Sequence, residues 1–365
     1  MTGSTFTGTP VTLPPTVTPA GGEPVVVQRF CTVADLVADM QAPGADEAML
    51  YQRIKEASEY LQKEIGWFIP VTMTRKFNGH GRDCLIVPPL LWVDRIVNAE
   101  ITLVATDYLL HPVNRFWANG PYGEILVDPD EAQNLGAWEE EEDGVEVTGG
   151  NGLYNLSKDS GANVGGGSGQ DSSQLILQVD DGSKVSAGMA LLIGSEQELV
   201  TGWSSPIDSS TTLNGAITSA SEQTLTLADA TKVNIGEVVR LDFEQMKVLD
   251  KQSNQIYVAR GWNKTAAVTH LTGIAVYVYR IATVERAVNG TTAATHAAAT
   301  NIYRYAIPDD ILFLTKEIAT LMLNKAKSGY QGRTGNDQGV IFYNDAFPKA
   351  DIERVKEAYS IKRVG

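Results

Sequence analysis

The residues best suited to acid–base or metal chemistry are the four histidines, His80, His111, His270 and His296. Histidine titrates near neutral pH and is a common metal ligand, so each is a candidate general base or ligand. However, His270 and His296 occupy equivalent positions of a repeated sequence. A side chain kept in both copies is expected to have one structural task, such as bonding a nearby carbonyl or Glu. The sequence therefore predicts no catalytic residue, no metal site and no cofactor.

Other motifs with known chemistry support the same prediction. The sequence contains no glycine-rich nucleotide motif, zinc-binding helix motif, paired-cysteine motif or nucleophile elbow. Cys31 and Cys84 lie far apart, and we expect them to be reduced, buried small hydrophobes. Asn155, Asn263 and Asn289 begin glycosylation-type triplets. Without a secretion signal we do not expect glycosylation, and the Asn and Thr of the two triplets at 263 and 289 predict side-chain-to-backbone turns instead.

Composition limits the classes of function. A hydrophobic fraction of 43% is ordinary for a globular protein. A net charge of −15 argues against a chain that wraps nucleic acid, which needs clustered Lys and Arg. No apolar run has the length of a membrane span, and the first residues lack a basic segment followed by an apolar one. We therefore expect synthesis in the cytosol without export by a signal peptide.

An internal repeat organises the chain. One set of residues recurs at a single fixed displacement: Val258, Arg260, Asn263, Thr265, Ala267, Thr269 and His270 return as Val284, Arg286, Asn289, Thr291, Ala293, Thr295 and His296. A second set matches further upstream: Lys232, Val233, Gly236, Glu244, Gln245 and Val248 correspond to Lys184, Val185, Gly188, Glu196, Gln197 and Val200. Identities at fixed spacing mark a duplicated structural module.

The order of these matches is unusual. One copy is contiguous over about 223–279, whereas the other is divided between 174–200 and 284–305. The simplest interpretation is nesting, with the complete copy in a loop of the interrupted one, and circular rearrangement of two adjacent copies is the competitor. Nesting predicts that strands within 190–200 and 284–305 pair with each other. Short alternating stretches in both copies favour small antiparallel barrels or sandwiches.

The segments on either side of the repeat combine helices with fewer strands. Apolar spacing predicts helices over 32–40 and 46–66, another after Pro308, and a last one from Pro348. Strand composition occurs within 72–103 and in a hairpin over 108–127, and 149–169 reads as a Gly/Ser/Asn linker. We therefore predict an α+β fold: a helical core with a small β-region, interrupted by an all-β insert of two nested modules.

The predicted domains follow from this division. Residues 1–28 form an extended arm, 29–155 the first part of the core, 156–305 the inserted β domain, and 306–365 the second part of the core with a C-terminal helix and tail.

The two outer parts resemble a known family. The run from 50 to 101 places Trp67 and Phe68 near the end of a helix, then the strand at 75–77 and the segment 85–96. This order is similar to that of head-to-tail adaptor (connector) proteins of tailed bacteriophages. Stretches at 107–114 and 143–149 and the helix after Pro308 are also similar, so the resemblance covers about 29–155 and 305–365. The repeat resembles β-modules of phage structural proteins, at 235–237, 244–248 and 258–270.

The resemblance implies a virion protein at the neck. Such a protein forms a homo-oligomeric ring, taken as dodecameric, that lies under the portal protein and joins the capsid to a downstream tail or neck protein. DNA passes through its lumen without specific binding. The family docks its C-terminal helix and tail on the portal, which carries over here to Val355, Tyr359, Ile361, Lys362, Arg363 and Val364.

Acidic side chains are candidates for the wall of such a channel. Residues 128–146 hold nine acidic side chains and no basic one, and the densest run is Glu139, Glu140, Glu141, Glu142 and Asp143. Like charge repels DNA and would keep it mobile, whereas the simpler interpretation is a solvated loop.

Two other classes of function remain open. One is a different neck or tail component, such as a stopper or a fibre-anchoring collar protein that binds tail fibres through the insert. The other is a bacterial surface or carbohydrate-binding β-module, which would need an export signal.

Overall fold

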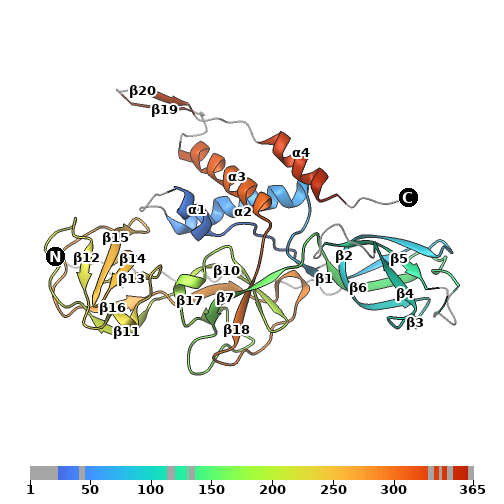
Figure 1. Cartoon of the computed structure of the whole chain (residues 1–365), viewed down its shortest axis with the longest axis horizontal. Coiled ribbons are helices and arrows are strands. Elements are labelled where there is room, and N and C mark those ends of the chain that lie inside the picture. The colour runs from blue at the N-terminus through green and yellow to red at the C-terminus, as the bar shows by residue number, and fades with distance from the viewer. Residues whose placement is uncertain are drawn as a thin grey trace, which may run out of the picture.

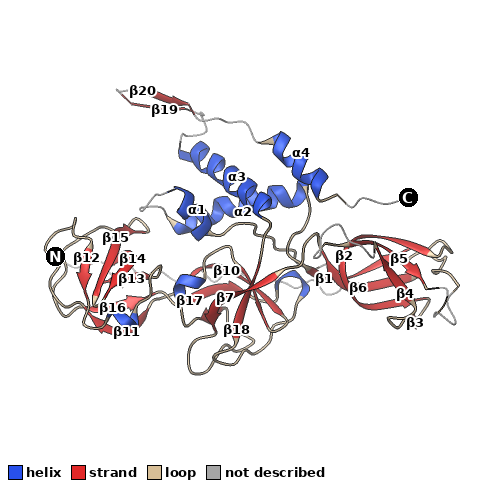
Figure 2. Ribbon diagram, in the orientation of Figure 1, coloured by secondary structure: helices blue, strands red, loops and turns tan. Residues whose placement is uncertain are grey.

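In the computed structural model of the chain, three β-units lie in a row and four described helices lie together on one side of the row (Figure 1; Figure 2). The structure describes residues 24–40, 46–112, 120–128, 130, 136–327, 333–336, 339–342 and 348–360. The predicted arm 1–28 therefore lies mostly outside the described residues.

The helical unit comprises α1 (Val33–Met40), α2 (Glu47–Glu64), α3 (Asp309–Lys327) and α4 (Lys349–Ala358). The Asp46 side chain caps α2 by accepting the backbone N–H groups of Ala48 and Met49, which have no partner within the helix. Apolar residues at steps of three and four bury one face of α2 against α3 and α4. No helix among the described residues is long and apolar enough to cross a membrane.

The flank sheet follows α2 along the chain. Its strands are β1 (Val71–Phe77), β2 (Cys84–Asn98), β3 (Ile101–Thr102), β4 (Tyr108–His111), β5 (Tyr122–Val127) and β6 (Val145–Asn151). They form an antiparallel sheet in the order β1-β6-β2-β5-β4, with β3 on β2. Strand β2 continues through Pro88 and Pro89 with a shift of register against β5.

The first module is made from two distant parts of the chain. Its strands are β7 (Ser157–Asn163), β8 (Ile176–Gln178), β9 (Ala190–Ile193), β10 (Glu196–Trp203), β17 (Ile281–Glu285) and β18 (Asn301–Tyr305). They form a six-stranded antiparallel sheet in the order β7-β18-β9-β10-β17-β8.

The second module is contiguous. Its strands are β11 (Ile207–Thr212), β12 (Thr224–Thr226), β13 (Val238–Leu241), β14 (Glu244–Gln252), β15 (Gln255–Trp262) and β16 (Ala275–Val278). Their order, β11-β16-β13-β14-β15-β12, repeats that of the first module strand for strand. A last hairpin, β19 (Arg333–Asn336) with β20 (Gly339–Phe342), lies between α3 and α4 in the chain.

The strand pairing expected from nesting is confirmed. In the second module β14 and β15 form a hairpin across Ser253 and Asn254. In the first module the equivalent strands β10 and β17 also pair, with Val200 opposite Val284, and β9 pairs with β18. The whole second module therefore occupies the position of one hairpin turn.

The predicted fold class is wrong in its balance of helix and strand. The structure is mostly β, with three antiparallel six-stranded sheets and four described helices, rather than a helical core with a small β-region. The strand content was underestimated in part because the segment 149–169 was predicted to be a linker. Gly149 and Gly150 belong to β6, where they let the backbone and ring of Trp92 approach closely, and 157–163 is strand β7. The polar β7 sequence has no apolar alternation from which a strand could be predicted.

Candidate functional site

Two of the predicted portal-docking residues lie in the helical unit. Val355 is buried in the core between the helices. The Tyr359 ring meets Phe68 edge to face at 4.9 Å between centroids, and its hydroxyl donates to Asp310 Oδ1 at 2.9 Å. Burial, and then the Asp310 carboxylate, raise the pKa of Tyr359. Both side chains therefore hold α4 in place. Ile361, Lys362, Arg363 and Val364 lie outside the described residues.

The predicted channel-lining carboxylates occupy the turn that leads into β6. Trp138 anchors this turn, because its ring is buried and its Nε1 donates to the carbonyls of Asp83 and Ile125. Glu139 is half-buried, and its Oε1 accepts the Glu140 N–H at 2.9 Å. The remaining carboxylates, at 140–143, are exposed. The turn thus presents four carboxylates to solvent from a fixed base.

The repeated polar residues form a buried cluster in the first module. Arg286 donates from Nε and Nη2 to the two oxygens of Glu196 at 2.7 and 2.6 Å. His296 Nε2 lies 2.9 Å from Glu196 Oε2, which also accepts the Ala294 N–H. Burial alone would raise the pKa of Glu196, but the hydrogen bonds from Arg286, Ala294 and His296 hold it below its usual value.

The second module contains the same cluster at equivalent positions. Arg260 bonds both oxygens of Glu244 at 2.6 and 2.7 Å, and His270 Nε2 lies 3.0 Å from Glu244 Oε2. The expectation that each histidine bonds a nearby Glu is therefore confirmed. In each module a bidentate contact between an arginine and a buried carboxylate connects strands and loops that are distant in sequence.

The residues around the two clusters differ. Strand β10 of the first module carries a second buried carboxylate, Glu198, where β14 of the second module carries Met246. Burial raises the pKa of Glu198 to about 7, although the nearby Arg286 guanidinium, 2.9 Å from Glu198 Oε1, acts in the opposite direction.

The clustered side chains of the first module also have the composition of a metal site. The ligand atoms of Glu196, Glu198 and His296 lie within 4.8 Å of one another. However, Arg286 already contacts both carboxylates, and its positive charge opposes a cation between them. The geometry therefore supports a neutralised ion cluster better than a metal centre.

The asparagines of the repeat connect the modules to the rest of the chain. Asn263 Nδ2 donates to Gln245 Oε1, and its Oδ1 accepts the Glu47 N–H at 3.3 Å. In the first module Asn289 Nδ2 donates to Gln197 Oε1, and its Oδ1 accepts the Val27 N–H at 2.7 Å. Each module thus presents the same Gln–Asn pair to the N-terminal part of the chain.

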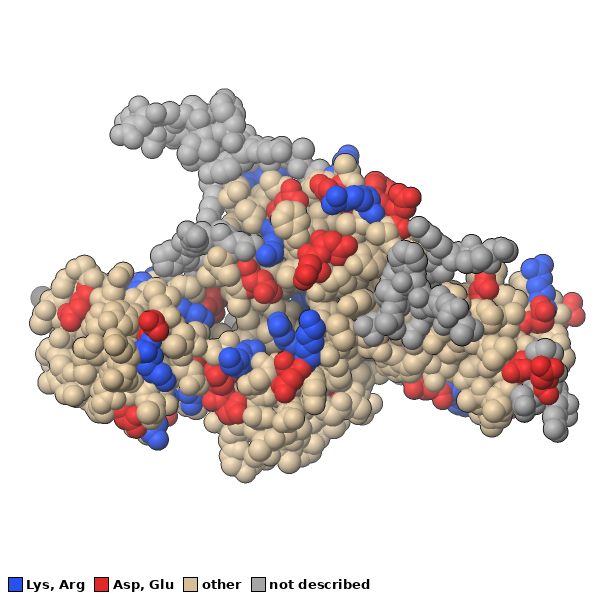
Figure 3. All heavy atoms as spheres, in the orientation of Figure 1, with Lys and Arg blue, Asp and Glu red and all other residues tan. Residues whose placement is uncertain are grey.

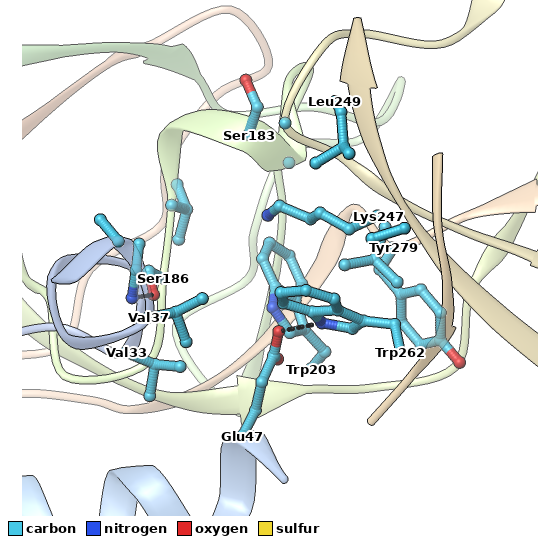
Figure 4. Close-up of a pocket in the computed structure, with 17 residues that line it drawn as sticks. Val33, Val37, Glu47, Ser183, Ser186, Trp203, Lys247, Leu249, Trp262 and Tyr279 are labelled. Atoms are coloured by element: carbon cyan, nitrogen blue, oxygen red, sulfur yellow. Dashed lines mark hydrogen bonds between the residues drawn. The ribbon is translucent and has the colours of Figure 1, made fainter. Parts of the chain in front are cut away.

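A pocket lies where α1, the start of α2 and the two modules meet (Figure 4). Its volume is about 460 Å³, within the range of small-molecule sites. Most of its wall is apolar, with Val33 and Val37 from α1, Trp203 from the first module, and Trp262 and Tyr279 from the second.

Two charged side chains enter this pocket. Glu47 Oε1 accepts the Trp262 Nε1–H at 2.8 Å. Lys247 extends across the cavity, with its ammonium 5.7 Å from the centroid of the Trp262 ring (Figure 4). Burial lowers the pKa of Lys247, while the carboxylates of Glu47 and Glu237 act in the opposite direction. Among the described residues, none bonds the Lys247 ammonium or forms an ion pair with it.

Sequence reasoning did not single out the residues of this pocket. The repeat could have indicated two of them. Lys247 and Trp262 occupy the positions that are equivalent to Leu199 and Val288 of the first module. These two positions are among those at which the copies differ, so the module fold does not require a lysine or a tryptophan there. That two modules and a helix would enclose them is a property of the tertiary structure.

The charge on the surface is mixed where it can be seen. Figure 3 shows acidic and basic side chains interspersed over one face of the molecule. The net charge of −15 is therefore not gathered into a single field on that face. No protein family, curated protein or solved structure matches this chain.

Proposed function

We propose that this protein is a structural component of a tailed-bacteriophage virion that forms the head-to-tail adaptor ring under the portal. One observation carries the proposal. The two stretches that resemble adaptor proteins are separated by the whole insert, yet they share one hydrophobic core. Leu50, Ile54 and Leu61 from the first stretch pack with Ile318 and Val355 from the second. Because both stretches that resemble adaptor proteins belong to one folded unit, together they support the proposal more strongly than either stretch does alone.

The arrangement of units suits a subunit of a ring. Each subunit of a cyclic ring must present two different faces to its neighbours. The row of β-units gives the molecule a long axis, and the helices occupy one side of it (Figure 1). On α3, Phe313 is 65% exposed, which makes it a candidate contact to a neighbouring subunit or to the portal.

Electron microscopy of purified protein and of virions tests the proposed assembly. We expect a ring of about twelve subunits located at the portal vertex. A monomer that never assembles with portal protein, or a location elsewhere in the virion, would contradict the adaptor function.

The C-terminal tail gives a second test of portal binding. Deleting residues 360–365 should leave the fold intact, because α4 is held by Val355 and Tyr359, and should abolish capture by immobilised portal protein. A matched variant that keeps the tail but replaces Lys362 and Arg363 with Gln separates the ionic from the apolar part of the contact. Undiminished capture of the deletion variant would rule out docking through the tail.

One observation favours the alternative, a stopper or fibre-anchoring collar protein. Phe243, Val268 and Leu271 of the second module are 93%, 44% and 75% exposed, and the bond between Asp242 and His270 brings their loops together. The equivalent residues of the first module are Ser195, Ala294 and Ala297. This exposed apolar surface occurs in only one of the two modules. It is therefore suited to bind another virion protein. Loss of tail fibres from virions that carry Phe243→Ser would favour this alternative.

A further inference from the structure

We propose that the pocket between α1 and the two modules binds a small organic anion with a flat apolar body, through an ion pair with the Lys247 ammonium. This site is separate from the proposed assembly function. It rests on the lining of the pocket, on the position of Lys247 and on the comparison between the two modules.

The lysine indicates the charge of the ligand. An ammonium in an apolar cavity loses hydration, and that loss is compensated only by an acceptor or an opposite charge. The two carboxylates whose charges act on the Lys247 ammonium already have other partners. Glu47 accepts from Trp262, and Glu237 accepts from Arg280 at 2.6 and 3.0 Å and from the Gly182 N–H. A carboxylate on the ligand would supply the missing acceptor.

The comparison between modules shows that the lysine is not needed for the fold. Leu199 holds the position of Lys247 in the first module, where it is buried, and Val288 holds that of Trp262. An apolar residue is therefore compatible with the same six-stranded sheet. Keeping a lysine at the first of these positions has a desolvation cost in the second module that a bound anion would offset.

The pocket wall indicates the shape of the ligand. Trp203 and Trp262 come from different modules and both enter the cavity (Figure 4). Together with Tyr279 and the valines of α1, they offer aromatic and aliphatic surface to a flat ring system. A bicyclic aromatic carboxylate is small enough for a cavity of about 460 Å³.

Titration calorimetry of the full chain with two matched probes tests the site. The probes are 2-naphthoate and its neutral analogue 2-naphthamide. The wild-type protein should bind the acid more tightly than the amide. Lys247→Met should weaken binding of the acid roughly tenfold and leave binding of the amide unchanged, because only the acid pairs with the ammonium. Lys232→Met, which removes an exposed lysine from the same module, should bind both probes as wild type does.

A second variant tests the location. Ala38 is exposed at the α1 edge of the pocket, so Ala38→Trp should block the cavity without disturbing the core, and both probes should be lost. Thermal melts establish that each variant is folded. Equal affinity of the wild-type protein for acid and amide, unchanged binding of the acid by Lys247→Met, or no binding of either probe would each overturn the proposal.

Discussion

At the scale of single residues, the duplication provides an internal control. Arg286, Glu196 and His296 of the first module make the same Arg–Glu and His–Glu contacts as Arg260, Glu244 and His270 of the second. Their shared geometry assigns them to the fold. The residues that differ between the copies are the ones that need another explanation.

Glu198 is such a difference, and it gives a prediction about pH. Its pKa is raised from 4.5 to about 7, so between these values the folded protein keeps a proton that the unfolded chain releases. Stability should therefore fall as the pH rises from about 4.5 to 7. At about 1.4 kcal/mol per pKa unit, the loss is at most about 3.5 kcal/mol. Glu198→Gln should remove this fall and be more stable than wild type at pH 8.

Urea denaturation at pH 5 and pH 8 measures the effect. The exposed Glu285 lies on the neighbouring strand β17, so Glu285→Gln is a matched control that should retain the wild-type pH dependence. Glu198→Met, which introduces the residue of the second module, should behave like Glu198→Gln. A wild-type pH dependence in Glu198→Gln would show that this carboxyl does not titrate in the expected window.

At the scale of elements, the joint between the two modules depends on a close backbone approach. The Gly182 N–H donates to Glu237 Oε1, and a Cβ at position 182 would lie 2.2 Å from the Tyr279 carbonyl oxygen. Gly182→Ala should therefore separate the modules locally and lower the free energy of unfolding by about 1–3 kcal/mol.

The same chain offers a control for this prediction. A Cβ at Gly167 meets nothing within 4 Å, so Gly167→Ala should be close to neutral. Both variants can be compared by urea denaturation. If Gly182→Ala is as stable as Gly167→Ala, the contact between 182 and Tyr279 does not hold the modules together.

At the scale of the whole molecule, the acidic turn can be tested for a role in assembly and DNA passage. Changing 140–143 to Gln, Gln, Gln and Asn removes four exposed charges and leaves Glu139 and Trp138, which anchor the turn. Position 143 has φ of 58°, a left-handed conformation that Asn tolerates. The melting temperature should therefore stay at the wild-type value.

The functional readout is the rate of DNA ejection from virions that carry this variant. If the turn lines the channel, ejection should slow, because the repulsion that keeps DNA mobile is weaker. Asp208→Asn, which changes an exposed carboxylate on the second module, is the control. Wild-type ejection with normal assembly would favour the simpler interpretation of a solvated loop.

The helices and the duplication could be predicted from the amino-acid sequence alone. The helices α1 to α4 follow from apolar spacing and caps, such as the Thr32–Asp35 box. The nesting could be predicted from the repeat, because equivalent strands of the two copies are expected to pair in the same way. The pairs β10 with β17 and β14 with β15 follow this rule. The strands β6 and β7 were not predicted, because their glycine-rich and polar sequences lack apolar alternation. The glycines of β6 are explained by the close approach of Trp92, and β7 is a strand because it pairs with β18.

How the units meet could not be predicted from the sequence and follows from the folded chain. The tertiary structure placed Val355 in the core and packed the partly buried Tyr359 ring on Phe68. It also brought Lys247, Trp203 and Glu47 around one pocket. Periodicity reports which face of an element is buried but not which distant element covers it. Contacts between modules depend on shape and on close approach, and these arise only when the whole chain is folded.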